Sequence, residues 1–314
     1  MPGDEEMGWA VDVADLLGAT FRLATPVVLA AIGGLVSFHA GIMNVAMEGF
    51  MLISAFTAVL VSYYAGAWAG VLVAVAVCLA FSALYALFVV DLQSDGFAIG
   101  FALNILATGL TIYLVRILGT DIFNSPEIQP LPHLGIRALA ASPILNAILN
   151  GHSVTVYVTP VLVWAMSAVL YRTPFGAHLR AAGEAPAALA ASGVSPRRVR
   201  YAASLICGAF CGMAGAHLSL GYLTQFIRDM TAGRGFMALA AILVGRGRPA
   251  ATALVGLLFA ASEAISMKIQ AYAAPQFALM LPYVVTIIAV TFMSGKPKKN
   301  VSSAPEETAE TATE

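Results

Sequence analysis

The sequence predicts an all-α integral membrane protein with about nine to ten transmembrane helices, some of them broken or re-entrant. Composition and charge placement carry this prediction. Sixty per cent of the 314 residues are hydrophobic, 11% are charged, and the mean hydropathy is +0.85. Soluble domains are nearer half apolar and a quarter charged, so this chain has too few polar residues to coat a water-soluble core. Its charges also gather at the two ends and in one internal segment.

Each span needs about 20 largely apolar residues. Runs suited to spans lie at 22–37, 43–63, 67–90, 97–118, 154–171, 201–224, 233–245, 250–269 and 277–294. The uncharged stretch 49–90 is long enough for two spans, with a natural break at 63–66. The run 233–245 is too short for one straight crossing. We therefore expect it to be part of a broken or re-entrant element, which is tolerated only where protein surrounds it.

The distribution of Lys and Arg predicts the orientation of these spans. Segment 172–200, the turn 246–248 and the start of the tail at 296–299 are all basic, which is typical of cytoplasmic loops. Alternation then places loop 119–152 and the acidic N-terminus outside. Arg228 and Arg234 conflict with this topology, because they fall on the outer side.

The same topology divides the chain into three parts. Residues 1–21 are expected to form an extracytoplasmic lead-in, and residues 22–295 a transmembrane domain. Residues 296–314, rich in Glu, Thr and Ala, are expected to be a disordered cytoplasmic tail.

Catalytic and metal-binding signatures are missing from the sequence. There is no G-x-S-x-G, no H-E-x-x-H and no G-x-x-x-x-G-K-[ST], and no cluster of His, Cys, Asp or Glu has the spacing of metal ligands. The three cysteines fall inside apolar runs and are expected to be small core residues. The sequence therefore predicts no catalytic residue, no metal and no cofactor of its own. Any energy from ATP would have to come through a partner.

A few polar residues lie within the apolar runs. An ionisable group inside a membrane is costly and usually faces a bundle interior or a water-filled path. We expect a translocation path to be lined by Asn44, Glu48, Asn104, Thr108 and Glu263. The alternative, equally open for the two glutamates, is that they tie helices together by accepting bonds from broken-helix backbone. His39 and His217 are expected to be hydrogen-bonded structural residues.

Segment 172–200 is the most organised connection between two spans. Pro186 and Gly193 bracket a short Ala-rich helix, in keeping with the preference for Pro at a helix start and Gly just past its end. The helix has basic residues on both sides and no lipid-facing apolar stripe. We therefore expect it to dock against a protein on the cytoplasmic side.

Four segments together resemble a known transporter family. LRAAGEAPAALAASGVSPRRVR (179–200) resembles the ATPase-contacting loop of permease subunits in bacterial ATP-binding-cassette importers. TPVVLAAIGGLVSFHAGIMNVAMEGFMLISAF (25–56), GAFCGMAGAHLSLG (208–221) and MTAGRGFMALAAILVGRGRP (230–249) are similar to blocks of the simple-sugar and nucleoside importer permeases, which are related to the permeases for branched-chain amino acids and ribose. The resemblance covers residues 20–295.

This resemblance implies a permease subunit in the bacterial cytoplasmic membrane, with a cytoplasmic C-terminus. Its partners would be an ATPase, a second permease subunit, an extracytoplasmic substrate-binding protein and membrane lipid, with no nucleic acid. The short helix would be a coupling helix that fits a groove on the ATPase. We expect this contact to involve Gly183, Glu184, Pro186, Ala187, Ala188, Gly193 and Val194.

Several functions remain open at this point. The N-x-x-x-E-G pattern at 44–49 favours nucleosides as substrates, followed by ribose-like simple sugars and then branched-chain amino acids. An ion-coupled secondary transporter would use Glu48 or Glu263 as its coupling carboxylate. A membrane-embedded enzyme would need a convergent catalytic set, and none is evident. A purely structural partner in a complex would not need glutamates within its spans.

Overall fold

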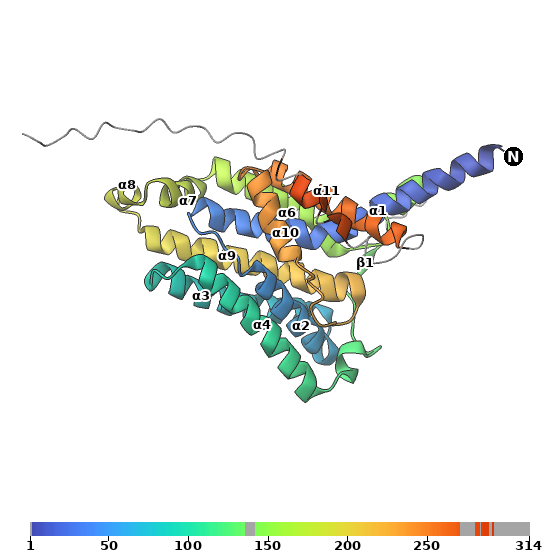
Figure 1. Cartoon of the computed structure of the whole chain (residues 1–314), viewed down its shortest axis with the longest axis horizontal. Coiled ribbons are helices and arrows are strands. Elements are labelled where there is room, and N and C mark those ends of the chain that lie inside the picture. Colours follow the sequence, from blue (N-terminus) through green and yellow to red (C-terminus); the bar gives the residue numbers. More distant parts are fainter. Residues whose placement is uncertain (1, 136–141, 271–279, 283, 289–290, 292–314) are drawn as a thin grey trace, which may run out of the picture.

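The computed structural model describes residues 2–135, 142–270, 280–282, 284–288 and 291. Figure 1 shows an elongated bundle of helices. The helices of chain segment 2–172 are α1 (Pro2–His39), α2 (Met47–Ala65), α3 (Ala67–Ala86), α4 (Gly96–Leu118), α5 (Pro143–Leu149) and α6 (Val154–Arg172). They are followed by α7 (Pro174–Glu184), α8 (Pro186–Ala191), α9 (Pro196–Ala216), α10 (Arg234–Val244) and α11 (Pro249–Ile269).

Short elements complete the described chain. Helices α3 and α9 continue as the π-helical turns η1 (Leu87–Asp91) and η4 (His217–Leu223), and η2 (Asp121–Asn124) is a 3-10 turn. Strands β1 (His133–Leu134) and β2 (His152–Ser153) form an antiparallel pair, with His133 opposite Ser153 and Leu134 opposite His152.

The predicted all-α membrane architecture is confirmed. Among the described residues, seven helices are long and apolar enough to cross a membrane. They span Val13–His39, Met47–Ala65, Ala67–Asp91, Gly96–Leu118, Val154–Arg172, Pro196–Leu223 and Pro249–Ile269. The run 233–245 is the short apolar helix α10, as its length predicted. The expected span 277–294 lies partly outside the described residues, so a total of nine to ten stays a prediction.

Domain boundaries were expected near the two chain ends, at 21/22 and at 295/296. Helix α1 begins at Pro2 and its apolar span at Val13, so no break in the helix marks the expected boundary at 21/22. The expected tail 296–314 lies outside the described residues.

Helices α1 and α9 form the centre of the bundle. Helix α1 packs against α9, α10 and α11, and α9 packs also against α2 and α3. Glycines allow α9 and α3 to approach each other closely. A Cβ atom at Gly208 would lie 2.5 Å from Ser82 Cβ, and one at Gly212 would lie 2.9 Å from Val75 Cα. Since real Cβ atoms do not approach so closely, larger residues here would push α9 and α3 apart.

Peripheral helices turn large apolar side chains outward. Trp68 on α3, Ile117 on α4 and Trp164 on α6 are all more than half exposed. Such exposure is ordinary for surfaces covered by lipid or by another membrane subunit.

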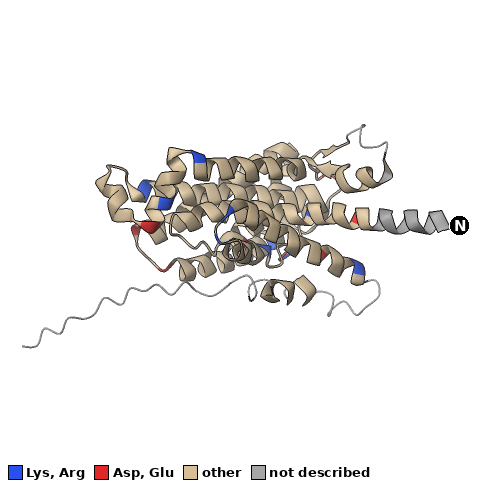
Figure 2. Ribbon diagram, turned by 90° about the horizontal axis from the view of Figure 1, so that it is seen from above, with Lys and Arg blue, Asp and Glu red and all other residues tan. Residues whose placement is uncertain are grey.

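The two ends of the bundle carry different elements. Helices α7 and α8 lie at one end, whereas the N-terminus and β1 lie at the other (Figure 1). Several Lys and Arg residues gather at the α7–α8 end (Figure 2). This arrangement agrees with the expectation that segment 172–200 and loop 119–152 face opposite sides of the membrane. Residues 136–141 of that loop lie outside the described residues.

His217 supplies a hydrogen bond that a proline removes from the central helix α1. Pro26 lies inside α1 and has no N–H, so the carbonyl of Arg22, four residues earlier, lacks its usual helical donor. The fully buried His217 donates from Nε2 to this carbonyl at 3.2 Å, while its Nδ1 accepts from the Thr155 hydroxyl. The structure thus confirms that His217 is a hydrogen-bonded structural residue.

We expect His217→Leu to destabilise the protein by about 1–3 kcal/mol, because it leaves the buried Arg22 carbonyl without a donor. The measurement is the thermal unfolding midpoint in detergent. Adding Pro26→Ala should recover part of the loss, because residue 26 then regains an N–H that can reach Arg22. An additive or larger loss in the double variant would contradict this explanation.

Candidate functional site

Helix α10 begins inside the bundle rather than at its surface. The first N–H groups of a helix have no partner within the helix, and membrane interiors offer no water to satisfy them. Glu48, in the first turn of α2, supplies the acceptors. Its Oε1 accepts from the Gly233 N–H at 2.8 Å, and its Oε2 accepts from the Gly235 N–H at 2.6 Å. The negative carboxylate also lies at the positive end of the α10 dipole.

Two glycines permit this contact. Gly233 has a φ of 81°, in the left-handed region that favours glycine. A Cβ atom at Gly235 would lie 2.5 Å from the Glu48 backbone nitrogen and 2.6 Å from its Cα. This glycine-rich stretch lacks the G-x-x-x-x-G-K-[ST] pattern, and the sequence predicted no role for it. Its position at the start of a short apolar run was the signal that a capped helix begins here.

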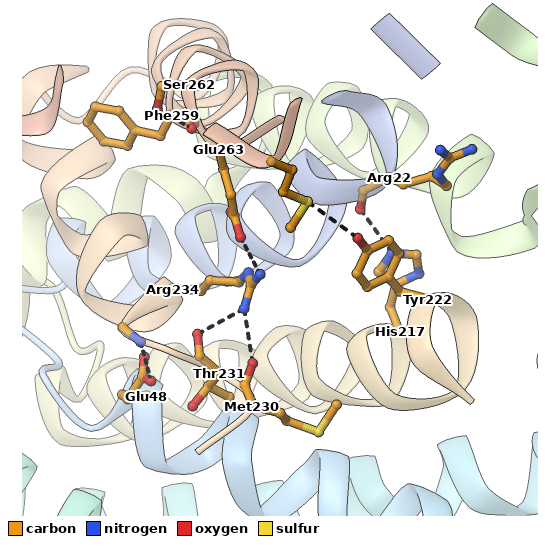
Figure 3. Close-up of polar contacts among 12 residues, drawn as sticks. Arg22, Glu48, His217, Tyr222, Met230, Thr231, Arg234, Phe259, Ser262 and Glu263 are labelled. Atoms are coloured by element: carbon orange, nitrogen blue, oxygen red, sulfur yellow. Dashed lines mark hydrogen bonds and ion pairs between the residues drawn. The ribbon is translucent and has the colours of Figure 1, made fainter. Parts of the chain in front are cut away.

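Arg234 joins α10 to α11 and to the preceding loop. It forms an ion pair with Glu263, and its Nη1 donates to the carbonyls of Met230 at 2.9 Å and Thr231 at 3.3 Å (Figure 3). The two charged side chains are only 9% and 16% exposed. A charge so buried is stable only with its partner in place.

The placement of Arg234 corrects the topology argument. From the sequence, Arg234 conflicted with the topology because it fell on the outer side of the membrane. Its guanidinium is instead buried in the bundle, where the pairing with Glu263 offsets the cost of desolvation. A charge of this kind carries no information about orientation.

An open cavity of about 540 Å³ lies beside the capped start of α10. Its walls include Glu48, Asn104, Thr108, Asp229, Thr231 and Phe236. The Asn104 side chain also fixes the geometry of this wall. Its Oδ1 accepts from the Gly49 N–H at 2.8 Å, and its Nδ2 donates to the Val45 carbonyl at 3.0 Å, which ties α4 to the start of α2.

Three of the five residues expected on a translocation path therefore meet at one cavity. The other two lie elsewhere. Asn44 is buried in the connection 40–46 before α2, where its Oδ1 accepts from the Ala46 N–H at 2.9 Å and its Nδ2 donates to Cys207 Sγ at 3.4 Å. Glu263 lines a separate cavity of about 90 Å³ with Arg234. Asp229, Thr231 and Phe236 were missed, because nothing in their local spacing connects them to α2 or α4.

The segment 172–200 forms two helices before α9. Helix α8 covers only Pro186–Ala191, so it is shorter than the Gly183–Val194 segment that was expected to contact the ATPase. Gly183 and Glu184 instead end α7, because Ala185 leaves the helical conformation with φ −146° and ψ 68°.

The end of α8 agrees with the glycine signal. Gly193 has a φ of 86°, and its N–H donates to the Ala190 carbonyl at 3.0 Å. The Val194 N–H donates to the Leu189 carbonyl at 3.3 Å. This pair of bonds is the usual way in which a glycine ends a helix.

Helix α8 exposes small side chains and buries one large one. Leu189 is buried, whereas Pro186, Ala187 and Ala188 are exposed. The preceding turn is fastened to the bundle by Arg200, which donates from Nη2 to the Ala182 carbonyl at 3.1 Å and from Nε to the Ala40 carbonyl at 3.3 Å.

The end of α1 connects the end of α7 to α10. Gly183 packs directly against the His39 carbonyl. The His39 side chain in turn donates from Nε2 to the Gly247 carbonyl at 2.7 Å, in the turn between α10 and α11. His39 is therefore hydrogen-bonded as expected, and it links the α7–α8 end to the helix that Glu48 caps.

Within the described ranges, no group of three or more His, Cys, Asp or Glu side chains could hold a metal ion. Both glutamates near the start of α10 make other contacts. Glu48 caps α10 and Glu263 pairs with Arg234.

A family model for the permease component of branched-chain amino acid transport systems matches residues 16–290. The chain belongs to this permease family. Several curated relatives match this chain over most of their own length. A guanosine ABC transporter permease protein of Bacillus subtilis, NupQ, is 30% identical over 92% of this chain and 97% of its own.

Two other relatives carry different substrate names. A putative glucose ABC transporter permease protein of Haloferax volcanii, TsgC13, is 31% identical over 90% of this chain and 88% of its own. A nucleoside ABC transporter permease protein of Lactococcus lactis, NupC, is 29% identical over 87% and 90%. No solved structure matches the chain significantly. Family and helices together make this chain a multi-pass membrane permease component.

We expect Arg234→Met to destabilise the permease by about 3–5 kcal/mol, because it leaves the Glu263 charge buried without a partner. The double variant Arg234→Met/Glu263→Met should be less destabilised than this single variant, since it buries no charge. Thermal unfolding midpoints in detergent provide the comparison. Additive losses in the double variant would mean that the two side chains do not depend on each other.

Proposed function

We propose that this chain is the permease subunit of an ATP-driven importer for nucleosides. The observation that carries the proposal is the open cavity at the start of α10, whose walls combine polar groups with an aromatic ring inside a membrane bundle. Two of the relatives described above carry guanosine or nucleoside in their names, which supports the substrate class. The partners would be an ATPase, a second permease subunit and an extracytoplasmic substrate-binding protein.

In this proposal the cavity is part of the translocation path. Glu48, Asn104 and Thr108 line it, and the half-length helix α10 closes one side. Asn44 and Glu263 would contribute without lining the cavity. Asn44 shapes the connection before α2, and Glu263 holds Arg234 in place. Discontinuous helices at the substrate site are a general feature of membrane transporters.

Coupling to ATP hydrolysis would occur through α8. Its exposed surface of Pro186, Ala187 and Ala188 is slim enough to enter a groove on an ATPase. Gly183, Glu184, Gly193 and Val194 frame this helix on both sides. Movement of α8 would reach the cavity through the contacts of Arg200 and His39, which connect α7, α1 and the α10–α11 turn.

This assignment also sets the orientation. The α7–α8 end would be cytoplasmic, together with the C-terminal tail, and the N-terminus would lie outside. Loop 119–152, on the opposite side from α8, would receive the binding protein. The partner ATPase would use the nucleotide, so this chain would need no cofactor.

An importer of simple sugars is a second candidate, favoured by the relative from Haloferax volcanii that is named for glucose. Ribose-like sugars share with nucleosides the hydroxyl groups that polar cavity walls can bind. An ion-coupled transporter is less compatible with the site, because both candidate carboxylates already hold structural contacts.

The substrate assignment can be tested with the complete complex in proteoliposomes. We expect ATP-dependent uptake of guanosine and uridine, and uptake that persists in the presence of an uncoupler. Ribose and glucose should not be taken up at comparable rates. Uptake of sugars without nucleosides would favour the second candidate, and uptake abolished by the uncoupler in the presence of ATP would favour ion coupling.

The role of α8 is tested in the same assay by Ala188→Trp. Because Ala188 is exposed, the substitution should leave insertion and folding intact, whereas its bulk should hold the ATPase away and abolish uptake and substrate-stimulated ATP hydrolysis. Val161→Trp on α6 is the control, since Val161 is 60% exposed and lies one turn from Trp164. Normal uptake with Ala188→Trp would remove α8 from the coupling mechanism.

A further inference from the structure

An aromatic surface adjoins the cavity at the start of α10. Phe236 forms part of the cavity wall and stacks on Phe101 of α4, with ring centroids 6.0 Å apart and an angle of 28° between the planes. Phe97 meets the edge of Phe101 at 5.0 Å. Phe236 and Phe101 are 39% and 40% exposed, and Phe101 extends the aromatic surface beyond the cavity wall that Phe236 forms.

Helical spacing places the aromatic and polar groups of α4 on one face. Phe97, Phe101, Asn104 and Thr108 follow one another at intervals of four, three and four residues, which superimposes them along one side of a helix. Asn104 and Thr108 line the cavity. The polar wall of the cavity therefore continues directly into the aromatic surface.

Contact with lipid does not explain this arrangement. Phe236 lies in the Glu48-capped first turn of α10, directly after Gly235, and Glu48 and Asp229 line the same cavity. Acidic groups facing lipid would be costly. A mixed wall of aromatic rings and polar groups is instead typical of a site for an amphipathic small molecule.

We propose that Phe236 and Phe101 form a stacking surface for the base of a nucleoside as it passes through the cavity. This inference rests on the proposed function and adds the part of the substrate that the permease itself contacts. Every nucleobase has a flat π face, so stacking tolerates different bases while still requiring one. The cavity volume of about 540 Å³ falls within the range of small-molecule sites.

A stacking surface also suits transport. A path must bind its solute well enough to admit it and weakly enough to release it. Two partly exposed rings offer such a contact without enclosing the base. Thr108 and Asp229, which are at least partly exposed, line the same cavity and can exchange hydrogen bonds with the sugar.

The test uses Phe236→Leu and Phe101→Leu in the reconstituted complex, with co-purification of the partner subunits as the check on assembly. Stacking is worth about 1–3 kcal/mol per base, so we expect guanosine uptake at subsaturating concentration to fall at least about fivefold. Guanosine should lose more than uridine, since a purine offers the larger face. Phe236→Trp should retain uptake of both nucleosides.

Tyr113→Leu is the matched control. Tyr113 is also an exposed aromatic residue of α4, but helical spacing turns it away from the face of Phe97 and Phe101. It is not part of the cavity wall. We expect its uptake of both nucleosides to be unchanged.

The outcomes separate the inference from the function on which it rests. If the unmodified complex takes up neither nucleoside, the proposed function fails and the inference fails with it. If the unmodified complex transports nucleosides and both Phe→Leu variants do so at the same rates, the inference alone is overturned. Equal losses of guanosine and uridine, or an equal loss with Tyr113→Leu, would also overturn it, because they would indicate general damage rather than stacking.

Discussion

A helix that starts inside a membrane protein must satisfy its first N–H groups without water, and the Glu48 carboxylate meets this requirement for α10. The rest of the site depends on this contact. It requires Gly233 for the left-handed turn and Gly235 for the close approach to α2. It also fixes the start of α10, and with it the position of Arg234, which then pairs with Glu263 on α11. The cavity lies beside the point where α10 begins.

The same helix is connected at its other end to the segment that we assign to ATPase coupling. His39 binds the turn after α10, the end of α1 packs against the end of α7, and Arg200 holds both of these near the start of α9. These are contiguous contacts between rigid helices, so displacement of α8 has a direct physical route to α10. Glu48 at one end and His39 at the other thus hold both ends of α10.

The sequence predicted those features that depend on local chemistry. The all-α architecture followed from composition, the short helix after residue 232 from its length, and the limits of α8 at Pro186 and Gly193 from proline and glycine preferences. The contact of Glu48 with Gly233 joins residues 185 positions apart, and no local pattern reports such a pair. The burial of Arg234 was not predicted for the same reason, since its partner Glu263 lies on another helix.

The central claim is that Glu48 and the start of α10 are held in direct contact, and Gly235→Ala tests it most directly. A Cβ atom at this position collides with backbone atoms of Glu48, so we expect a loss of about 1–3 kcal/mol and an unfolding midpoint several degrees lower. Gly109→Ala is the control, because a Cβ atom on that helical glycine meets nothing within 4 Å. It should leave the midpoint unchanged or raise it, since alanine favours helices. Equal midpoints for Gly235→Ala and Gly109→Ala would contradict the account.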